Sequence, residues 1–124
     1  MATIKSYTDI SQSKKLAEIL PLESADMGWY YSRNPQAARN QMWLGTKAEN
    51  ADIPCWSLAA LLDVIPKQIK DCNVLRIDIS ENEFAIWYDE IGYGVNNDLP
   101  NITTESAIDA CYEMILKLHE LNLL

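Results

Sequence analysis

The only histidine of the chain and one of its cysteines are the residue types from which a nucleophile and its base could be built. Cys55 stands at the start of a predicted helix, where free amide N–H groups and the helix dipole lower the pKa of a thiol. With His119 as general base, such a thiol would be an activated nucleophile. Its place between Pro54 and Trp56 is equally typical of a small buried side chain. A small thiol-dependent enzyme therefore stands as one alternative function.

Ligands for a metal ion or a cofactor are sparse in this sequence. The three cysteines, Cys55, Cys72 and Cys111, lack the paired spacing of zinc sites, and His119 has no second histidine beside it. The sequence contains no glycine-rich phosphate loop and no GxSxG motif. We expect no metal site, no cofactor and no assigned catalytic residue.

Three consecutive aromatic residues, Trp29, Tyr30 and Tyr31, form the segment to which we assign a binding role. Neither a strand nor a helix can turn three neighbours to one face, so at least one of them is expected to be exposed. An exposed aromatic side chain beside Arg33 is typical of interface hot spots. The alternative, a segment that folds back and serves only the core, stays open. The expected function is a small accessory protein, without enzymatic activity, that binds another protein through this segment.

Charge is spread unevenly along the chain, whose formal net charge is −8. Residues 1–47 hold six basic and four acidic side chains, whereas residues 48–124 hold four and fourteen. This balance disfavours direct binding to nucleic acid or to an anionic membrane. A row of carboxylates can instead imitate a phosphate backbone, so an acidic inhibitor of a DNA-handling protein is a second alternative. Its candidate acidic face comprises Asp78, Glu81, Glu83, Asp89 and Glu90.

Length and composition predict one folded domain over residues 1–124. The 124 residues, 48% hydrophobic and 23% charged, suffice for a core without disulfide or metal support. The sequence has no apolar stretch of about 18 residues and no signal-peptide pattern. An odd number of cysteines suits a reducing compartment. We expect a cytoplasmic protein that is a monomer or a homodimer.

Two helices are predicted in the first half of the chain. The first covers about Ser11–Leu20, with Asp9 or Ser11 as its cap and Pro21 as its stop. The second is the alanine- and leucine-rich run Trp56–Ile65. These helices are expected to cover part of a sheet.

A third and longest helix is predicted near the C-terminus, over about Thr104–Leu121. Thr103 or Thr104 is expected to cap it, with Glu105 in the first turn, where a carboxylate suits the helix dipole. Its apolar residues recur at three- and four-residue steps and predict a stripe that packs against a sheet. The stripe comprises Ala107, Ile108, Cys111, Met114, Ile115, Leu118 and Leu121.

A central hairpin, over about 73–80 and 84–91, is the most specific structural prediction. A turn at Glu81-Asn82 makes one face of the hairpin apolar on both strands and leaves Arg76 and Asp78 on the other. The expected pairs are Leu75 with Tyr88, Arg76 with Trp87, Ile77 with Ile86, Asp78 with Ala85, and Ile79 with Phe84.

The remaining segments have a weaker pattern. Met42–Gly45 is predicted as a short strand, Pro21–Gln41 as a loop with at most a short strand, and Gly92–Asn97 as a bent strand or loop. Three helices with a small antiparallel sheet make the fold class α+β, with the helices packed on one sheet face.

Three stretches also resemble a known group of sequences. They are YTDISQSKKL from Tyr7 running on to ESADM at Met27, WSLAALL from Trp56 with the following Ile65-Pro66, and DACYEMILKLHEL ending at Leu121. Together they resemble a group of short bacterial proteins, often encoded on phage-like or other mobile elements, for which no activity is established. The resemblance implies a small accessory or interaction protein and assigns no catalytic residue.

Overall fold

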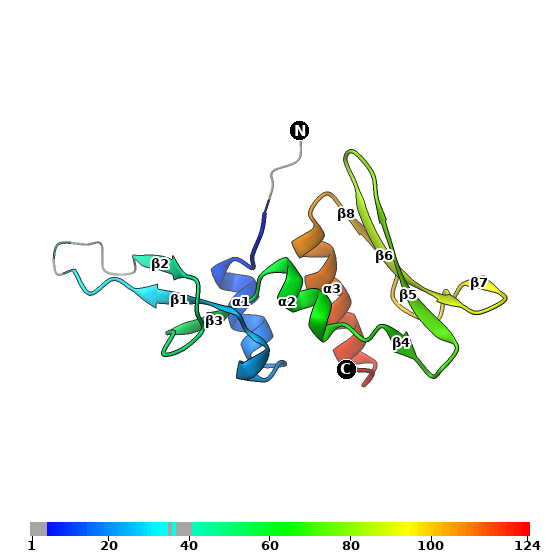
Figure 1. Cartoon of the computed structure of the whole chain (residues 1–124), viewed down its shortest axis with the longest axis horizontal. Coiled ribbons are helices and arrows are strands. Elements are labelled where there is room, and N and C mark those ends of the chain that lie inside the picture. The colour runs from blue at the N-terminus through cyan, green and yellow to red at the C-terminus, as the bar shows by residue number, and fades with distance from the viewer. Residues whose placement is uncertain (1–4, 35, 37–40) are drawn as a thin grey trace.

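The computed structural model describes residues 5–34, 36 and 41–124, which form α-helices and two antiparallel sheets (Figure 1). The elements, in chain order, are α1 (Ile10–Ala17), the 3-10 turn η1 (Leu22–Ser24), β1 (Met27–Tyr31), β2 (Met42–Gly45), β3 (Ile53–Cys55), α2 (Leu58–Val64), β4 (Gln68–Ile69), β5 (Asn73–Ile79), β6 (Phe84–Glu90), β7 (Gly94–Val95), β8 (Ile102–Thr104) and α3 (Ala107–Glu120). The predicted α+β class, with its longest helix at the C-terminus, is confirmed.

The smaller sheet has the strand order β2-β1-β3 and holds the aromatic segment in its central strand. Trp29 pairs with Leu44 on one side and with Ile53 on the other. The short strand predicted at Met42–Gly45 is confirmed as β2. The aromatic segment is a full strand, β1. Its polar and apolar residues do not alternate, because aromatic side chains occupy both of its faces.

The larger sheet has the order β4-β5-β6-β7, with β8 pairing β6 as well. The predicted hairpin register is confirmed at every pair, from Leu75 with Tyr88 to Ile79 with Phe84. A slip by one residue would turn Ile86 and its apolar neighbours to the outer face, so burial enforces this register. The segment predicted as a bent strand or loop contains the short strand β7.

The core lies where α3 packs against β6 and β8 and where α1 and α2 close around it (Figure 1). Along α3, the predicted stripe is buried from Ile108 to Leu118, with Cys111 fully inside. Leu121 is the exception, because it follows the last turn and is exposed. The stripe is thus used within the chain and is not free to form a dimer interface.

Three local predictions need correction. The second helix begins at Leu58 with Ser57 as its cap, so Cys55 ends strand β3 and does not stand at a helix start. The third helix is capped by Ser106, whose hydroxyl accepts from the backbone N–H of Asp109, so Glu105 precedes the cap and does not lie in the first turn. Thr104 is the last residue of β8, because pairing with β6 holds it extended.

The first helix follows the prediction at its start and ends early. Asp9 accepts from the backbone N–H of Gln12, and the Gln12 side chain accepts from the backbone N–H of Asp9, which completes a capping box. The helix ends at Ala17, one turn before Pro21. Among the described residues, each helix is too short or too polar to span a bilayer.

Candidate functional site

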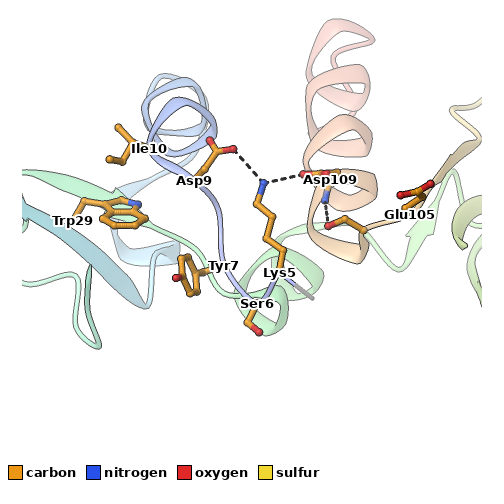
Figure 2. Close-up of a pocket in the computed structure, with 9 residues that line it drawn as sticks. Lys5, Ser6, Tyr7, Asp9, Ile10, Trp29, Glu105 and Asp109 are labelled. Atoms are coloured by element: carbon orange, nitrogen blue, oxygen red, sulfur yellow. Dashed lines mark hydrogen bonds and ion pairs between the residues drawn. The ribbon is translucent and has the colours of Figure 1, made fainter. Parts of the chain in front are cut away.

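A cavity of about 500 Å³ lies between the segment before α1, strand β1 and the start of α3 (Figure 2). This volume is in the range of small-ligand pockets. The cavity, which we call the Lys5–Asp109 cavity, is lined by Lys5, Ser6, Tyr7, Asp9, Ile10, Trp29, Glu105, Ser106 and Asp109. Aromatic and charged side chains therefore line the same cavity.

One wall of the cavity is aromatic. The rings of Tyr7 and Trp29 meet edge to face, with their centroids 5.9 Å apart and their planes at 69°. The Trp29 indole N–H donates to the carbonyl of Thr8 at 3.4 Å. A backbone bridge between Tyr7 and Ser57 holds the main chain from which the other ring projects. Tyr7 and Trp29 therefore form one side of the cavity, which we call the Tyr7–Trp29 wall.

The charged part of the cavity is organised by Lys5. Its ammonium donates to Asp9 at 3.1 Å, to Gln12 at 2.8 Å and to Asp109 at 3.0 Å. An ammonium has three donors, so each one is used. The Gln12 side chain also donates to Asp109, at 2.8 Å. This network joins the first turn of α1 to the first turn of α3 (Figure 2).

The pKa values of the network follow from these contacts. Burial of Lys5 on its own lowers the pKa of the ammonium, but the hydrogen bonds and charges of Asp109 and Asp9 outweigh it, so the pKa is raised. Burial of Asp9 favours its neutral form, yet the backbone N–H of Gln12 and the charge of Lys5 lower its pKa. Both groups are therefore held in their charged forms at neutral pH.

Glu105 is the lining carboxylate that the network leaves free. It is exposed, it precedes the Ser106 cap, and it has no hydrogen bond or ion pair to any described residue. The lining carries one cation and three carboxylates (Asp9, Glu105 and Asp109), so its formal charge is −2. A cavity with an aromatic wall and excess carboxylate suits a cationic group.

The four aromatic and basic residues predicted to bind a partner do not form one surface. Trp29 lines the cavity, whereas Tyr30 points to the opposite face of β1 and stacks on Trp43, with ring centroids 4.6 Å apart. Tyr31 is 39% exposed, so the expectation that at least one of the aromatics is exposed is confirmed. Arg33 is exposed and lies 3.6 Å from Asp52.

Tyr30 has a structural role within the smaller sheet. Its hydroxyl donates to the carbonyls of Lys47 and Glu49, at 2.8 and 2.7 Å. Its ring lies over Gly45, where an added Cβ would come within 2.7 Å of the ring. This side chain ties the segment after β2 to the strand and is not free for a partner.

The thiol activation expected for Cys55 is wrong. The side chain is fully buried, and burial raises the pKa of its thiol in spite of hydrogen bonds from Thr8 and Ser13. The thiol donates to the Thr8 carbonyl at 3.4 Å. His119 is exposed in the last turn of α3, and no hydrogen bond joins it to Cys55 in the described part of the chain. A nucleophile–base pair is therefore not formed by these residues.

The candidate acidic face is divided between two environments. Asp89 accepts from Arg76 at 3.3 Å and from the Trp87 indole at 2.8 Å, which offsets its charge. Glu81 and Glu83 are exposed at the tip of the hairpin. Asp78 is exposed on the strand, and Glu90 is half-buried at the far end of the hairpin. The carboxylates do not form a continuous row.

Clusters of three or more potential metal ligands are absent from the described residues. Sequence reasoning missed the cavity, because Lys5 and Asp109 carry no motif and lie 104 positions apart. Of the residues that line the cavity, Asp9 had a structural role that could be predicted from the sequence, as the cap of the first helix. Comparisons with protein-family models, curated proteins and solved structures found no match for this chain.

Proposed function

We propose that this chain is a binding module that docks another protein by taking a basic side chain of that protein in the Lys5–Asp109 cavity. The observation that carries the proposal is that the Tyr7–Trp29 wall and the free carboxylate of Glu105 line the same cavity. An arginine or lysine stem would pack on the aromatic wall while its charged end meets the carboxylate.

Preorganisation supports this choice. The wall is held by the Trp29 hydrogen bond to Thr8 and by the edge-to-face contact of the two rings, so little side-chain freedom is lost on binding. The carboxylates of Asp9 and Asp109 are already turned toward a cation, Lys5, and each keeps further acceptor capacity. The cavity therefore needs no rearrangement before it accepts a second positive group.

The proposal retains Trp29 from the aromatic segment as the partner-binding residue and replaces the rest of that segment with Tyr7 and Glu105. The resemblance to accessory proteins of mobile elements is compatible with a protein partner. It stays a prediction, as does the cytoplasmic location.

The test is an NMR titration of the whole chain with N-acetyl-arginine amide and, separately, with N-acetyl-citrulline amide. The two probes have the same shape and differ in charge. We expect the arginine probe to shift the Trp29 indole N–H and the Ser106 amide, with millimolar affinity. The citrulline probe should bind at least fivefold more weakly, since it lacks the charge that Glu105 meets.

Two matched variants sharpen the test. Glu105→Gln removes the free carboxylate and should weaken arginine binding several-fold, whereas Glu113→Gln, at an exposed site on α3, should leave it unchanged. Equal responses to the two probes, or shifts confined to residues away from the cavity, would overturn the proposal.

A further inference from the structure

One edge of the larger sheet is left open by the fold. Strand β4 covers only the start of β5, where Ile69 pairs with Asn73 and Gln68 with Val74. The carbonyl of Lys67 then accepts the N–H of Leu75 at 3.0 Å. Beyond this bond, no described strand pairs with that side of β5. We call residues 76–79 the open β5 edge.

The backbone groups on this edge can be assigned from the hydrogen-bond pattern. Bonds from Ser80 to Glu83 and from Ile91 to Cys72 mark the pairs at which β5 and β6 exchange hydrogen bonds. In an antiparallel ladder such pairs recur every second residue, so even-numbered β5 residues face β6. The N–H and C=O groups of Ile77 therefore point outward, as the N–H of Leu75 does.

The odd-numbered side chains of the open β5 edge are apolar. They lie on the sheet face that α3 covers at β6, but α3 does not cover them. Ile77 and Ile79 are 40% and 74% exposed, although their partners across the hairpin, Ile86 and Phe84, are buried.

Edge strands that avoid pairing usually carry proline, a bulge or charged side chains, lysine above all. The two charged residues of this edge, Arg76 and Asp78, are of opposite sign and so do not repel a second copy of the same strand. The open β5 edge has no proline, lysine or bulge. Such an edge is a template for another strand.

The sequence of this edge is complementary to itself. We infer that a second copy of the chain pairs with it, antiparallel, about a two-fold axis at Ile77. In that register Arg76 of one copy lies opposite Asp78 of the other, twice, and Ile77 lies opposite Ile77. In each copy the outward N–H of Ile77 then donates to the C=O of Ile77 in the other copy, so the pair exchanges two hydrogen bonds. A closed two-fold dimer of this kind uses the same surface on both copies.

Charge selects this register over its neighbours. A shift of the axis to Asp78 sets that carboxylate against its own copy, and a shift to Arg76 sets two guanidinium groups together. Arg76 already contacts Asp89 through its Nε, and the remaining guanidinium N–H groups are available for Asp78 of the second copy. The axis at Ile77 is the one that pairs opposite charges.

The dimer is expected to be weak. Because Lys67 occupies the edge beside Leu75, the new ladder is confined to the three residues 76–78, with the exposed Ile79 side chains adding apolar contact at either end. So small an interface belongs with transient complexes, and we expect a dissociation constant on the order of 100 µM.

Sedimentation equilibrium from about 10 µM to about 1 mM at low salt tests the inference. Arg76→Asp and Asp78→Arg each set like charges against each other in the homodimer, so each should raise the dissociation constant at least tenfold. A 1:1 mixture of these two variants again pairs opposite charges at both contacts and should recover association. The double variant Arg76→Asp/Asp78→Arg should recover it too. Arg33→Asp, at an exposed arginine elsewhere, is the control and should dimerise like the wild type.

Folding of each variant is checked by near-ultraviolet circular dichroism. Should Arg76→Asp unfold because it loses Asp89, then Asp78→Arg, which keeps Arg76 and its contact with Asp89, still decides the question. A wild type that stays monomeric at 1 mM overturns the inference, as do single variants that associate like the wild type. Single variants that weaken association without recovery in the mixture also overturn it, since they show that the two charges do not face each other.

Discussion

Lys5 and Asp109 are 104 residues apart in the chain, yet the Lys5 ammonium lies 3.0 Å from a carboxylate oxygen of Asp109. This contact is the direct ionic link between the first turn of α3 and the segment that leads into α1. The same ammonium contacts Asp9, the capping residue of α1, so the Lys5 side chain connects the N-terminal ends of α1 and α3. Lys5 and Asp109 both line the proposed binding cavity.

Replacement of Lys5 by methionine is expected to lower the free energy of unfolding by about 1 kcal/mol, because charge-assisted hydrogen bonds at a half-buried site are lost while the aliphatic stem is kept. The measurement is urea denaturation at neutral pH. Lys14→Met is the matched control: this lysine is exposed on α1 and makes no ion pair with any described residue. It should change stability by less than about 0.5 kcal/mol.

The same Lys5→Met variant also bears on the proposed function. Without the ammonium, the formal charge of the cavity falls from −2 to −3, so the arginine probe should bind more tightly even though the protein is less stable. Tighter binding with lower stability separates a ligand site from a merely structural network. Weaker binding of the arginine probe to a folded Lys5→Met variant would count against a cation site.

Thiol labelling of the native protein should follow burial. Cys72 is partly exposed and is expected to react first with a thiol reagent such as DTNB at pH 8, whereas Cys55 and Cys111 are fully buried and should react only when the structure opens. Peptide mapping by mass spectrometry after timed labelling identifies each site. If Cys55 reacted as fast as a free thiol, the thiol-dependent enzyme would again be a serious alternative.

Alkaline pH should destabilise the fold through its buried thiols. Burial raises the pKa of Cys111 to about 12 from 9.0, and that of Cys55 is raised as well. Above pH 9 the unfolded chain therefore releases protons that the folded chain retains, so unfolding is favoured as the pH rises. The free energy of unfolding should fall by up to about 1.4 kcal/mol per pH unit for each thiol.

A pair of denaturation series in reductant, at pH 8 to 10, measures this effect. Cys111→Ala lowers stability at every pH because a buried side chain is shortened, but its stability should fall less steeply with rising pH than that of the wild type. Equal slopes for the two proteins would show that Cys111 does not contribute to the alkaline loss.

The hairpin and α3 could be predicted from the sequence because each has one buried face and a clear period. Only one register places Leu75 and Ile77 against apolar partners, and the structure has that register. The steps of the α3 stripe likewise match a helix that covers a sheet. Where one face of a helix or strand is buried, the period of its apolar residues is enough to predict that element from the sequence.

Strands β1 and β3 were harder to predict for two separate reasons. In β1, Trp29 and Tyr30 occupy opposite faces and both are partly covered, so no polar face marks the strand. In β3, Pro54 argues against a strand, yet β3 is the edge of its sheet, where proline is tolerated. The Lys5–Asp109 cavity depends on contacts between remote segments, which no local pattern encodes.

The two glycines of the smaller sheet should differ in how well they tolerate alanine. At Gly45 an added Cβ meets the side-chain ring of Tyr30 at 2.7 Å, and a ring can shift by small rotations. At Gly28 it meets the backbone carbonyl of Lys47 at 2.9 Å together with the side chain of Ala51, so the segment after β2 has to move. Overpacking of this kind costs about 1–3 kcal/mol, and we expect Gly28→Ala to lie at the upper end and Gly45→Ala at the lower.

Thermal and urea denaturation of the two variants measure the difference. Because β1 carries Trp29, Gly28→Ala should also disturb the cavity wall and shift the Trp29 indole N–H resonance, whereas Gly45→Ala should leave this resonance in place. Stability and the Trp29 resonance are linked because β1 is the central strand of the smaller sheet, so a displacement of β1 moves the side chains on both of its faces. Equal destabilisation would contradict the predicted difference between the two glycines. A Trp29 resonance that Gly28→Ala leaves unmoved would show that the cavity wall is held independently of the smaller sheet.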